Sequence, residues 1–512
     1  MTVSPAIALC TLNAKYAHCA LSLRYLRANL GDLRDRACLI EALASERPVD
    51  IAERILATAA PIVGLGIYVW NTAPSLELVL ILKAVRPELI VVLGGPEVSH
   101  ETDEQAIVAA ADYVITGEGE DAFSTLCAQL VAGERPADRV IAGGLPDLTA
   151  LVLPYDQYTD QDLASRYVYV EASRGCPYRC EFCLSALDTG VRPFPADALL
   201  AELETLIQRG ARHFRFIDRT FNLDTASSTA LLQFFLDRQH LGLFVHFEAV
   251  PDRFPDAIRE AVARFKPGVL QLEIGIQTLD KDTARRISRP QNETRIADNL
   301  RFLRDETNAH IHADLIVGLP GEDEASFARG FDRLVALGPT EIQVGILKRL
   351  RGTPIIRHTA RFAQVYSTEA PYEVLQTSAI SFGDMQRMKR FARAWDLVAN
   401  RGNFPQTLNL VLADAPYARF NQLTEWMFEE LGSFYAVDLV RLAKLLFVWL
   451  TEHGGITEAA ARDTVAEDYC DDGRRKTPRF LKGAPERKKR APGPLHRRQL
   501  RHAEKAERRT TP

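Results

Sequence analysis

Short apolar segments alternate with amphipathic segments through two long blocks of this 512-residue chain. In the first block, the segments rich in Val, Ile and Leu are residues 6–10, 37–41, 62–67, 89–93 and 113–116. Segments with helical periodicity separate them, at residues 22–30, 51–59, 75–85 and 102–111. Buried strands that alternate with helices are typical of a parallel sheet covered on both faces. We therefore predict an α/β fold, with a doubly wound parallel sheet over residues 1–150.

The alternation pauses at residues 146–162, which we predict to be a linker, and then returns. Candidate strands of the second block are residues 167–172, 213–217, 244–248, 269–274, 310–317 and 341–347. The helical segments between them are residues 198–208, 227–238, 256–265, 294–304 and 325–337. Six strand–helix units predict a partial (β/α)6 barrel over residues 163–355, with functional residues at the carboxyl ends of its strands.

Beyond residue 357 the alternation ends, and residues 384–399 and 420–450 have the periodicity of amphipathic helices. We expect a helical unit over residues 356–470 and a basic, disordered tail over residues 471–512. From residue 474 onward, 15 Lys or Arg residues stand against three Glu residues. Such a tail could attract nucleic acid, or it could stay solvated beside the acidic remainder of the chain.

The composition is that of a globular protein, since 47% of the residues are apolar and 25% are charged. The longest apolar stretches, residues 59–70 and 445–450, are shorter than the roughly 18–20 residues that cross a bilayer. The N-terminal segment lacks the basic start and apolar middle of a secretory signal. We therefore expect a cytoplasmic protein without a membrane partner.

Three of the eight cysteines lie within eight residues, in the segment RGCPYRCEFC that follows the first strand of the second block. Thiolates favour iron–sulfur clusters or zinc. A zinc site would need a fourth Cys or His, and this loop contains none. A cluster of four irons on Cys176, Cys180 and Cys183 would leave one iron open to a small molecule. These three residues are therefore the predicted metal ligands and the predicted catalytic centre.

The pattern Cys-x-x-x-Cys-x-aromatic-Cys, at the end of the first strand of a six-unit β/α block, resembles the signature of the radical S-adenosylmethionine (SAM) superfamily. The resemblance implies a [4Fe-4S] cluster whose open iron binds S-adenosylmethionine and cleaves it to a 5′-deoxyadenosyl radical. Phe182 matches the aromatic position that lies near the adenine in that family. A reducing protein such as a flavodoxin or ferredoxin is implied as the electron donor.

Two further segments fit the same resemblance. Glu273, Gly275 and Gln277 end the fourth strand of the block and resemble the strand that contacts the cofactor, although a strand end can be polar simply because it meets solvent. Gly318 and Pro320 belong to a Gly-Leu-Pro-Gly-Glu turn after the fifth strand. That turn resembles the one that packs against the adenine, but Pro-Gly turns are common in proteins.

The order of the two blocks is similar to that of the radical SAM subgroup with an N-terminal cobalamin-binding domain. Ligands of such sheets lie beyond the carboxyl ends of the strands, so the corrin is expected near Asn13, Trp70, Gly95 and Glu118. The Asp-x-His-x-x-Gly motif, which supplies a lower axial histidine in some cobalamin proteins, is missing from residues 1–150. Many members of the subgroup also lack it, and a domain that has lost the cofactor is the alternative.

The resemblance implies a cobalamin-dependent radical SAM enzyme that transfers a methyl group to an unactivated carbon of a small-molecule or peptide substrate. A radical rearrangement or cyclisation without methyl transfer is one alternative, and an RNA-modifying enzyme recruited by the basic tail is another. The related methylthiotransferases carry a second cluster on three N-terminal cysteines. Here Cys10, Cys19 and Cys38 fall in three different predicted elements, which disfavours that variant.

Overall fold

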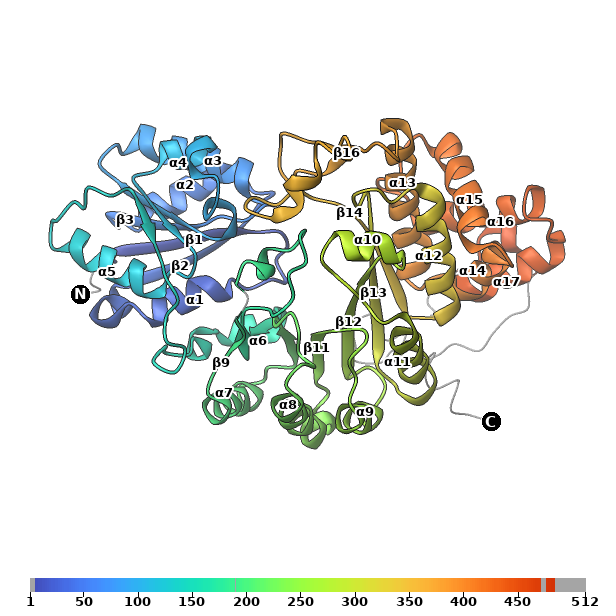
Figure 1. Ribbon diagram of the computed structural model, residues 1–512, viewed down its shortest axis with the longest axis horizontal. Helices are drawn as coiled ribbons and strands as arrows, with labels where there is room; N and C mark the ends of the chain where they lie inside the picture. Colours follow the sequence, from blue (N-terminus) through green and yellow to red (C-terminus); the bar gives the residue numbers. More distant parts are fainter. Residues whose placement is uncertain (1–4, 189, 471–475, 484–512) are drawn as a thin grey trace.

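The computed structural model describes residues 5–188, 190–470 and 476–483. These residues form two six-stranded parallel sheets and a helical region that follows them (Figure 1). Every helix in these ranges is too short or too polar to span a bilayer. Most of the predicted basic tail, residues 471–475 and 484–512, lies outside the described residues.

The first sheet has the strand order β2-β1-β3-β4-β5-β6, and all its neighbours are parallel. Its strands are β1 (Ile7–Asn13), β2 (Ala37–Leu43), β3 (Ile62–Gly66), β4 (Ile90–Gly94), β5 (Tyr113–Thr116) and β6 (Val140–Ala142). Its helices are α1 (Leu21–Ala28), α2 (Pro48–Ala57), α3 (Thr72–Val85), α4 (Ala106–Ala110) and α5 (Glu120–Val131). Alternate residues of β1 enter two separate apolar cores, which confirms the doubly wound sheet. Strand β6 and helix α5 were not among the predicted elements.

The second sheet has the order β14-β13-β12-β11-β10-β7 and is also entirely parallel. Its strands are β7 (Val168–Val170), β10 (His213–Phe216), β11 (Phe244–Ala249), β12 (Leu270–Gln277), β13 (His310–Val317) and β14 (Glu341–Ile346). Its helices are α7 (Ala196–Gln208), α8 (Thr225–Arg238), α9 (Asp256–Ala263), α10 (Lys281–Arg286), α11 (Glu293–Glu306) and α12 (Glu324–Leu337). Strands β14 and β7 are the two edges, so the barrel is partial, as predicted.

Side chains alternate strictly along the central strands of this barrel. In β12, Leu272 and Ile274 are buried in the core that the helices cover, whereas Glu273 is partly exposed on the other face. In β13, Ala313 is buried and the neighbouring Asp314 is partly exposed. Because successive side chains of a strand point to opposite faces, the inner face of the barrel is polar.

The predicted linker is a packed segment. It contains the short helices η4 (Tyr155–Gln157) and α6 (Asp160–Ser165). The side chains of Tyr155 and Tyr158 are fully buried in the barrel core. The Tyr158 hydroxyl donates to the carbonyl of Tyr169 in β7 at 3.2 Å. The polar residues between these tyrosines break the periodicity, which is why the sequence pattern does not reveal the burial.

The helical region contains α13 (Phe382–Trp395), continued as a π-helix (Asp396–Asn400), followed by α14 (Pro405–Leu412), α15 (Pro416–Leu431), α16 (Leu439–Glu452) and α17 (Glu458–Cys470). The prediction of one helix over residues 420–450 is wrong. Helix α15 ends at Gly432, where φ is 68°, and the carboxylate of Asp438 begins α16 by accepting from the backbone N–H of Arg441 at 2.9 Å.

Candidate functional site

The three clustered cysteines lie in a loop that closes on itself at its base. Strand β8 (Ser173–Arg174) precedes the loop and pairs in antiparallel fashion with β9 (Arg192–Pro193), which follows it. Gly175 has a φ of 89°, and a Cβ there would collide with the carbonyl oxygen of Gly190. The backbone of the loop is therefore closed tightly at a position that only glycine occupies without strain.

The three sulfur atoms are close neighbours. Cys176 and Cys180 are buried and Cys183 is half-buried. Burial raises the pKa of the Cys176 thiol, and the nearby charges of Cys183 and Cys180 raise it further. Thiolates placed together in this way need a cation to hold them, which fits a metal centre.

Thiolates that share one tetrahedral zinc lie roughly 3.8 Å apart, given bonds of about 2.3 Å. Among the described residues, the group of metal-ligand atoms within 4.8 Å of one another is Cys19, Glu41 and Asp162, and not the three cysteines of the loop. Arg24 forms ion pairs with both carboxylates of that group, at 3.0 and 3.1 Å, which accounts for it without a metal.

An arginine that the sequence analysis did not identify joins the cysteine loop to strand β12. One Nη of Arg289 donates to Sγ of Cys180 at 3.1 Å, and the other donates to the carbonyl oxygen of Gly275 at 2.5 Å. The predicted cluster ligand and the predicted cofactor-contacting strand therefore meet at one side chain. Arg289 lies in the loop between α10 and α11 and belongs to neither motif.

Glu181, between the second and third cysteines, binds the loop to two segments that are distant in the sequence. Its carboxylate is buried and accepts from the Ser288 hydroxyl at 2.6 Å, from Nε2 of His358 at 2.7 Å and from Nε of Arg357 at 2.8 Å. The next residue, Phe182, packs half-buried against the barrel core. These contacts hold the loop to the segment after α10 and to the helix η7 (Pro354–His358).

Glu273 lies on the inner face of the barrel, near the carboxyl end of β12. Nε2 of His246 lies 3.1 Å from its carboxylate. Burial would raise the pKa of Glu273, but the hydrogen bond and charge of His246 outweigh it and lower that pKa to about 2. Burial raises the pKa of the neighbouring Asp314 well above its usual range, and the charges of Glu273 and Glu248 raise it further. The inner face of the barrel therefore carries carboxyl groups whose pKa values are shifted in opposite directions.

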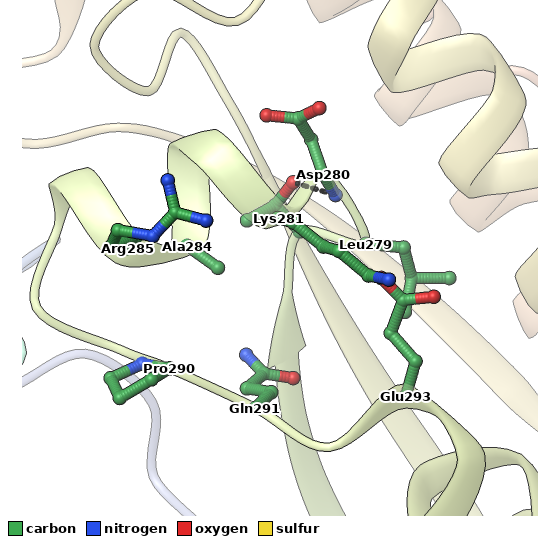
Figure 2. A pocket seen from close by; sticks show the side chains of 9 residues that line it. Leu279, Asp280, Lys281, Ala284, Arg285, Pro290, Gln291 and Glu293 are labelled. Atoms are coloured by element: carbon green, nitrogen blue, oxygen red, sulfur yellow. Dashed lines mark hydrogen bonds and ion pairs between the residues drawn. The ribbon is translucent and has the colours of Figure 1, made fainter.

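Gln277 marks an irregularity at the end of β12. Its φ is 69°, and the register with β13 shifts between Gly275 and Gln277. A bulge of this kind turns the following side chain away from the regular strand face. A pocket of about 170 Å³ opens just beyond it, with Lys281 and Arg285 on one side and Gln291 and Glu293 on the other (Figure 2). The predicted site residues do not line this pocket.

The predicted turn after β13 is built from Gly318 to Glu322. Gln364 donates to the carbonyl of Gly318 at 3.4 Å, and Arg286 donates to the carbonyl of Pro320. Glu322 is buried and accepts from the Thr278 hydroxyl at 2.6 Å. Burial raises the pKa of Glu322 to about 7. The turn is thus fastened to the loops around α10 and to the segment after η7.

The four residues expected near the corrin all lie at the carboxyl ends of strands in the first sheet. Asn13 is buried, and its amide donates to the carbonyl of His18 at 3.1 Å and to Glu41 at 3.0 Å. Trp70 is 48% exposed and stacks on Tyr68 with ring centroids 4.5 Å apart. Of these four residues, Trp70 offers the broad apolar face that a flat ligand would need.

Gly95 and Glu118, the other two residues expected near the corrin, are held in place by contacts within the protein. Gly95 has a φ of 110°, and a Cβ there would collide with the carbonyl oxygen of Ile67. Both carboxylate oxygens of Glu118 bind arginines, one Arg174 and the other Arg192. The side chain of Glu118 is therefore already paired within the protein.

Two histidines of the first block, His18 and His100, contact the barrel and lie outside any axial-histidine motif. Nδ1 of His18 lies 2.5 Å from the Tyr169 hydroxyl, and burial lowers the pKa of His18. A Cβ at Gly352 would overlap the ring of His100, so this ring is packed against the segment after β14. This placement agrees with the missing axial-histidine motif.

Ion pairs join the strand-end loops of the two sheets in two places. Arg174, beside the cysteine loop, pairs with Glu118 after β5 at 2.7 Å. Arg351, after β14, pairs with Glu97 after β4 at 3.0 Å, and Arg349 pairs with Glu101 at 2.9 Å. The carboxyl edges of the two sheets are therefore held together, and the predicted sites of both cofactors lie along this junction.

Three family models match the chain in the same order as these parts. A B12 binding domain matches residues 8–127, and the Radical SAM superfamily matches residues 170–334. The chain joins a B12-binding domain to a radical SAM domain. The cofactors that these two domains imply are a [4Fe-4S] cluster, S-adenosylmethionine and cobalamin. The third family model, which is described as a protein of unknown function (DUF4080), matches residues 360–508.

Curated relatives match this chain at low identity. A tRNA-2-methylthio-N(6)-dimethylallyladenosine synthase from Ralstonia pickettii is 26% identical over 270 residues, which are 50% of this chain and 58% of that protein. A 2-(S-pantetheinyl)-carbapenam-3-carboxylate methyltransferase from Streptantibioticus cattleyicolor is 26% identical over 334 residues, which are 58% of this chain and 48% of that protein. The chain spans about half the length of these two relatives.

Solved structures share the fold over most of the chain. The radical SAM methyltransferase TsrM from Kitasatospora setae, with tryptophan and a SAM analogue bound, has a TM-score of 0.59 at 15% identity and covers 73% of this chain and 80% of its own. The cobalamin-dependent SAM radical enzyme OxsB, with aqua-cobalamin and S-adenosylmethionine bound, has a TM-score of 0.57 at 14% identity and covers 92% and 84%. At these identities the likeness establishes the fold.

Proposed function

We propose that this radical SAM enzyme uses cobalamin to transfer a methyl group to an unactivated carbon of its substrate. The observation that carries the proposal is the junction of the two sheets. Ion pairs hold the carboxyl edge of the B12-binding sheet against the barrel edge that bears the three-cysteine loop. A methyl donor and a hydrogen-abstracting group must reach the same carbon, and a junction of this kind allows it.

The residues of the chain have separate parts in this reaction. Cys176, Cys180 and Cys183 would hold the cluster, and Trp70 would cover one face of the corrin. The bound cofactors supply the radical that removes a hydrogen atom and the methyl group that replaces it. The polar inner face of the barrel, with Glu273 beside His246, would bind and orient polar groups of the substrate.

The names of the relatives support methyl transfer. The carbapenam enzyme and TsrM are methyltransferases by name, and TokK from Streptomyces tokunonensis, a cobalamin-dependent radical SAM methyltransferase, is 27% identical over 331 residues. That match covers 56% of this chain and 47% of TokK.

Anaerobic reconstitution with iron, sulfide and cobalamin, followed by addition of S-adenosylmethionine labelled in its methyl group, tests the proposal. We expect near-stoichiometric bound cobalamin and, once a reductant has brought the cobalt to Co(I), transfer of the label from S-adenosylmethionine to it. With reductant present, 5′-deoxyadenosine should also form. Formation of 5′-deoxyadenosine by a chain that binds no cobalamin would instead favour rearrangement or cyclisation without methyl transfer.

Modification of RNA is a second candidate, because one relative is a tRNA-modifying synthase by name. The three N-terminal cysteines do not support a second cluster. Burial raises the pKa of both Cys10, inside β1, and Cys19 to about 12, and Cys38 lies on a separate strand, β2. If the basic tail recruits RNA, binding should weaken steeply with salt and disappear when residues 474–512 are removed.

A further inference from the structure

We infer that Arg174 is a positioning residue that couples the cluster site to the cobalamin site. This inference rests on the function proposed above. Arg174 stands two positions before Cys176 and reaches the loop after β5, where Glu118 and Glu120 lie. The three side chains, together with Glu171, are called the Arg174 clamp below.

Every nitrogen of the Arg174 guanidinium is paired with a carboxylate. Nη1 lies 2.7 Å from Glu118, Nη2 lies 2.7 Å from Glu120 and Nε lies 3.0 Å from Glu171. The planar fork of arginine suits such multiple pairing, whereas lysine would reach one carboxylate as a point charge.

The clamp is shielded from water. The side chain of Arg174 is 11% exposed, and those of Glu120 and Glu171 are 7% and 13% exposed. Removing one partner of a buried pair leaves the other charge uncompensated, which is strongly unfavourable. The two loops that the clamp joins therefore resist separation when either of them binds a ligand.

The clamp contacts the base of the cysteine loop, where β8 and β9 pair. Arg174 in β8 and Arg192 in β9 are opposite each other in the short antiparallel pair that closes the loop. Arg192 binds the second carboxylate oxygen of Glu118. One carboxylate from the B12-binding domain thus holds both strands at the base of the loop.

The other end of the clamp lies in the predicted cobalamin loop. Glu118 follows Gly117 after β5, and Glu120 is the first residue of α5. A ligand that orders this loop also orders Arg174, and the same holds for a cluster that orders the cysteine loop. Because such coupling is reciprocal, the cluster should strengthen cobalamin binding by the factor by which cobalamin strengthens cluster retention.

Cobalamin affinity, measured before and after cluster reconstitution in the full-length chain, tests the inference. In the wild type, the cluster should tighten cobalamin binding by about fivefold or more. The affinity ratio is the cobalamin dissociation constant without the cluster divided by that with the cluster. In Arg174→Met this ratio should fall to near one, while the iron content stays high because the three cysteines are intact. The EPR signal of the reduced cluster should respond to cobalamin in the wild type and not in the variant.

Glu118→Ala is a second variant that removes the clamp from its other side, at a carboxylate that is 21% exposed. It should lower this ratio in the same direction. The losses in the double variant should add only in part, because both single variants remove the Arg174–Glu118 contact. Arg349→Met is the matched control, since Arg349 also bridges the two domains but pairs with Glu101, away from the cysteine loop.

Three outcomes would overturn the inference. The ratio could survive in Arg174→Met and Glu118→Ala, or the control could lose it equally, which would indicate a general loss of domain packing. In both cases the wild type would still hold the two cofactors, so the proposed function would stand. A wild type that takes up neither cluster nor cobalamin would overturn the proposed function and the inference with it.

Discussion

Glu322 closes the turn after β13 and is buried against the Thr278 hydroxyl. Because burial raises its pKa from 4.5 to about 7, the folded chain holds this proton more tightly than the unfolded chain. The free energy of unfolding of the wild type should therefore fall, relative to that of Glu322→Gln, as the pH rises from about 4.5 to about 7. The change is on the order of 3 kcal/mol.

Denaturant unfolding of both proteins at several pH values measures this difference. At pH 4.5 the two should be nearly equal, since the glutamine amide can still accept the Thr278 hydrogen bond. Parallel stability profiles across this range would show that the Glu322 carboxyl titrates normally.

Trp70 is the exposed aromatic side chain at the predicted corrin surface. Trp70→Ala should weaken cobalamin binding about tenfold, because a stacked aromatic face contributes roughly 1 kcal/mol beyond its buried area. Isothermal titration of the reconstituted protein with cobalamin measures the dissociation constant. Tyr435→Ala is the control, since Tyr435 is 83% exposed and lies in the helical region. Equal affinities in the wild type and Trp70→Ala would place the corrin elsewhere.

At the scale of single residues, the sequence predicts the candidate metal ligands better than it predicts the residues that hold those ligands in place. The spacing of Cys176, Cys180 and Cys183 predicts a shared loop because it depends on neighbouring positions alone. Arg289 and Arg174 contact groups that are distant in the chain, so only the fold brings them to the site. Glu181, an acidic residue between two of the cysteines, is a local sequence signal for such a support, and the structure shows that it is buried.

At the scale of elements, the strands of both sheets except β6 were predictable, because they carry buried apolar residues. Strand β6 is short and largely exposed at the edge of its sheet. The short helix α10, with six residues, has too few turns to show periodicity. The helix over residues 420–450 was overextended, since its apolar pattern continues across Gly432 and the break depends on a single backbone conformation. The burial of Tyr155 in the predicted linker likewise depends on its tertiary neighbours.

Gly95 provides a test at this scale. Gly95→Ala should lower the free energy of unfolding by roughly 3 kcal/mol, because the backbone conformation is strained for alanine and a Cβ would collide with Ile67. Gly144→Ala is the matched control, since Gly144 also has a positive φ, of 77°, but no atom lies within 4 Å of its Cβ position. Gly144→Ala should lower the free energy of unfolding by about 1 kcal/mol. Thermal or urea denaturation compares the two, and equal losses would contradict the packing role of Gly95.

At the scale of the whole molecule, the fold order could be predicted but the junction could not. Two alternating blocks predict two parallel sheets, and the rule for strand ends predicts where each binds its ligand. No pattern within either block predicts that the carboxyl edges of the two sheets meet. That arrangement depends on ion pairs between residues more than 50 positions apart, such as Arg174 with Glu118 and Arg351 with Glu97.

The central claim is that three cysteines hold a four-iron cluster with one iron open to S-adenosylmethionine. The most direct measurement is the iron and acid-labile sulfide content of the anaerobically reconstituted chain, with Cys38→Ala as the control for cysteine loss. We predict about four irons and four sulfides per chain in the wild type and the control, and almost none in Cys176→Ala, Cys180→Ala or Cys183→Ala. Full iron and sulfide in any of those three variants, or none in the wild type, would contradict the account.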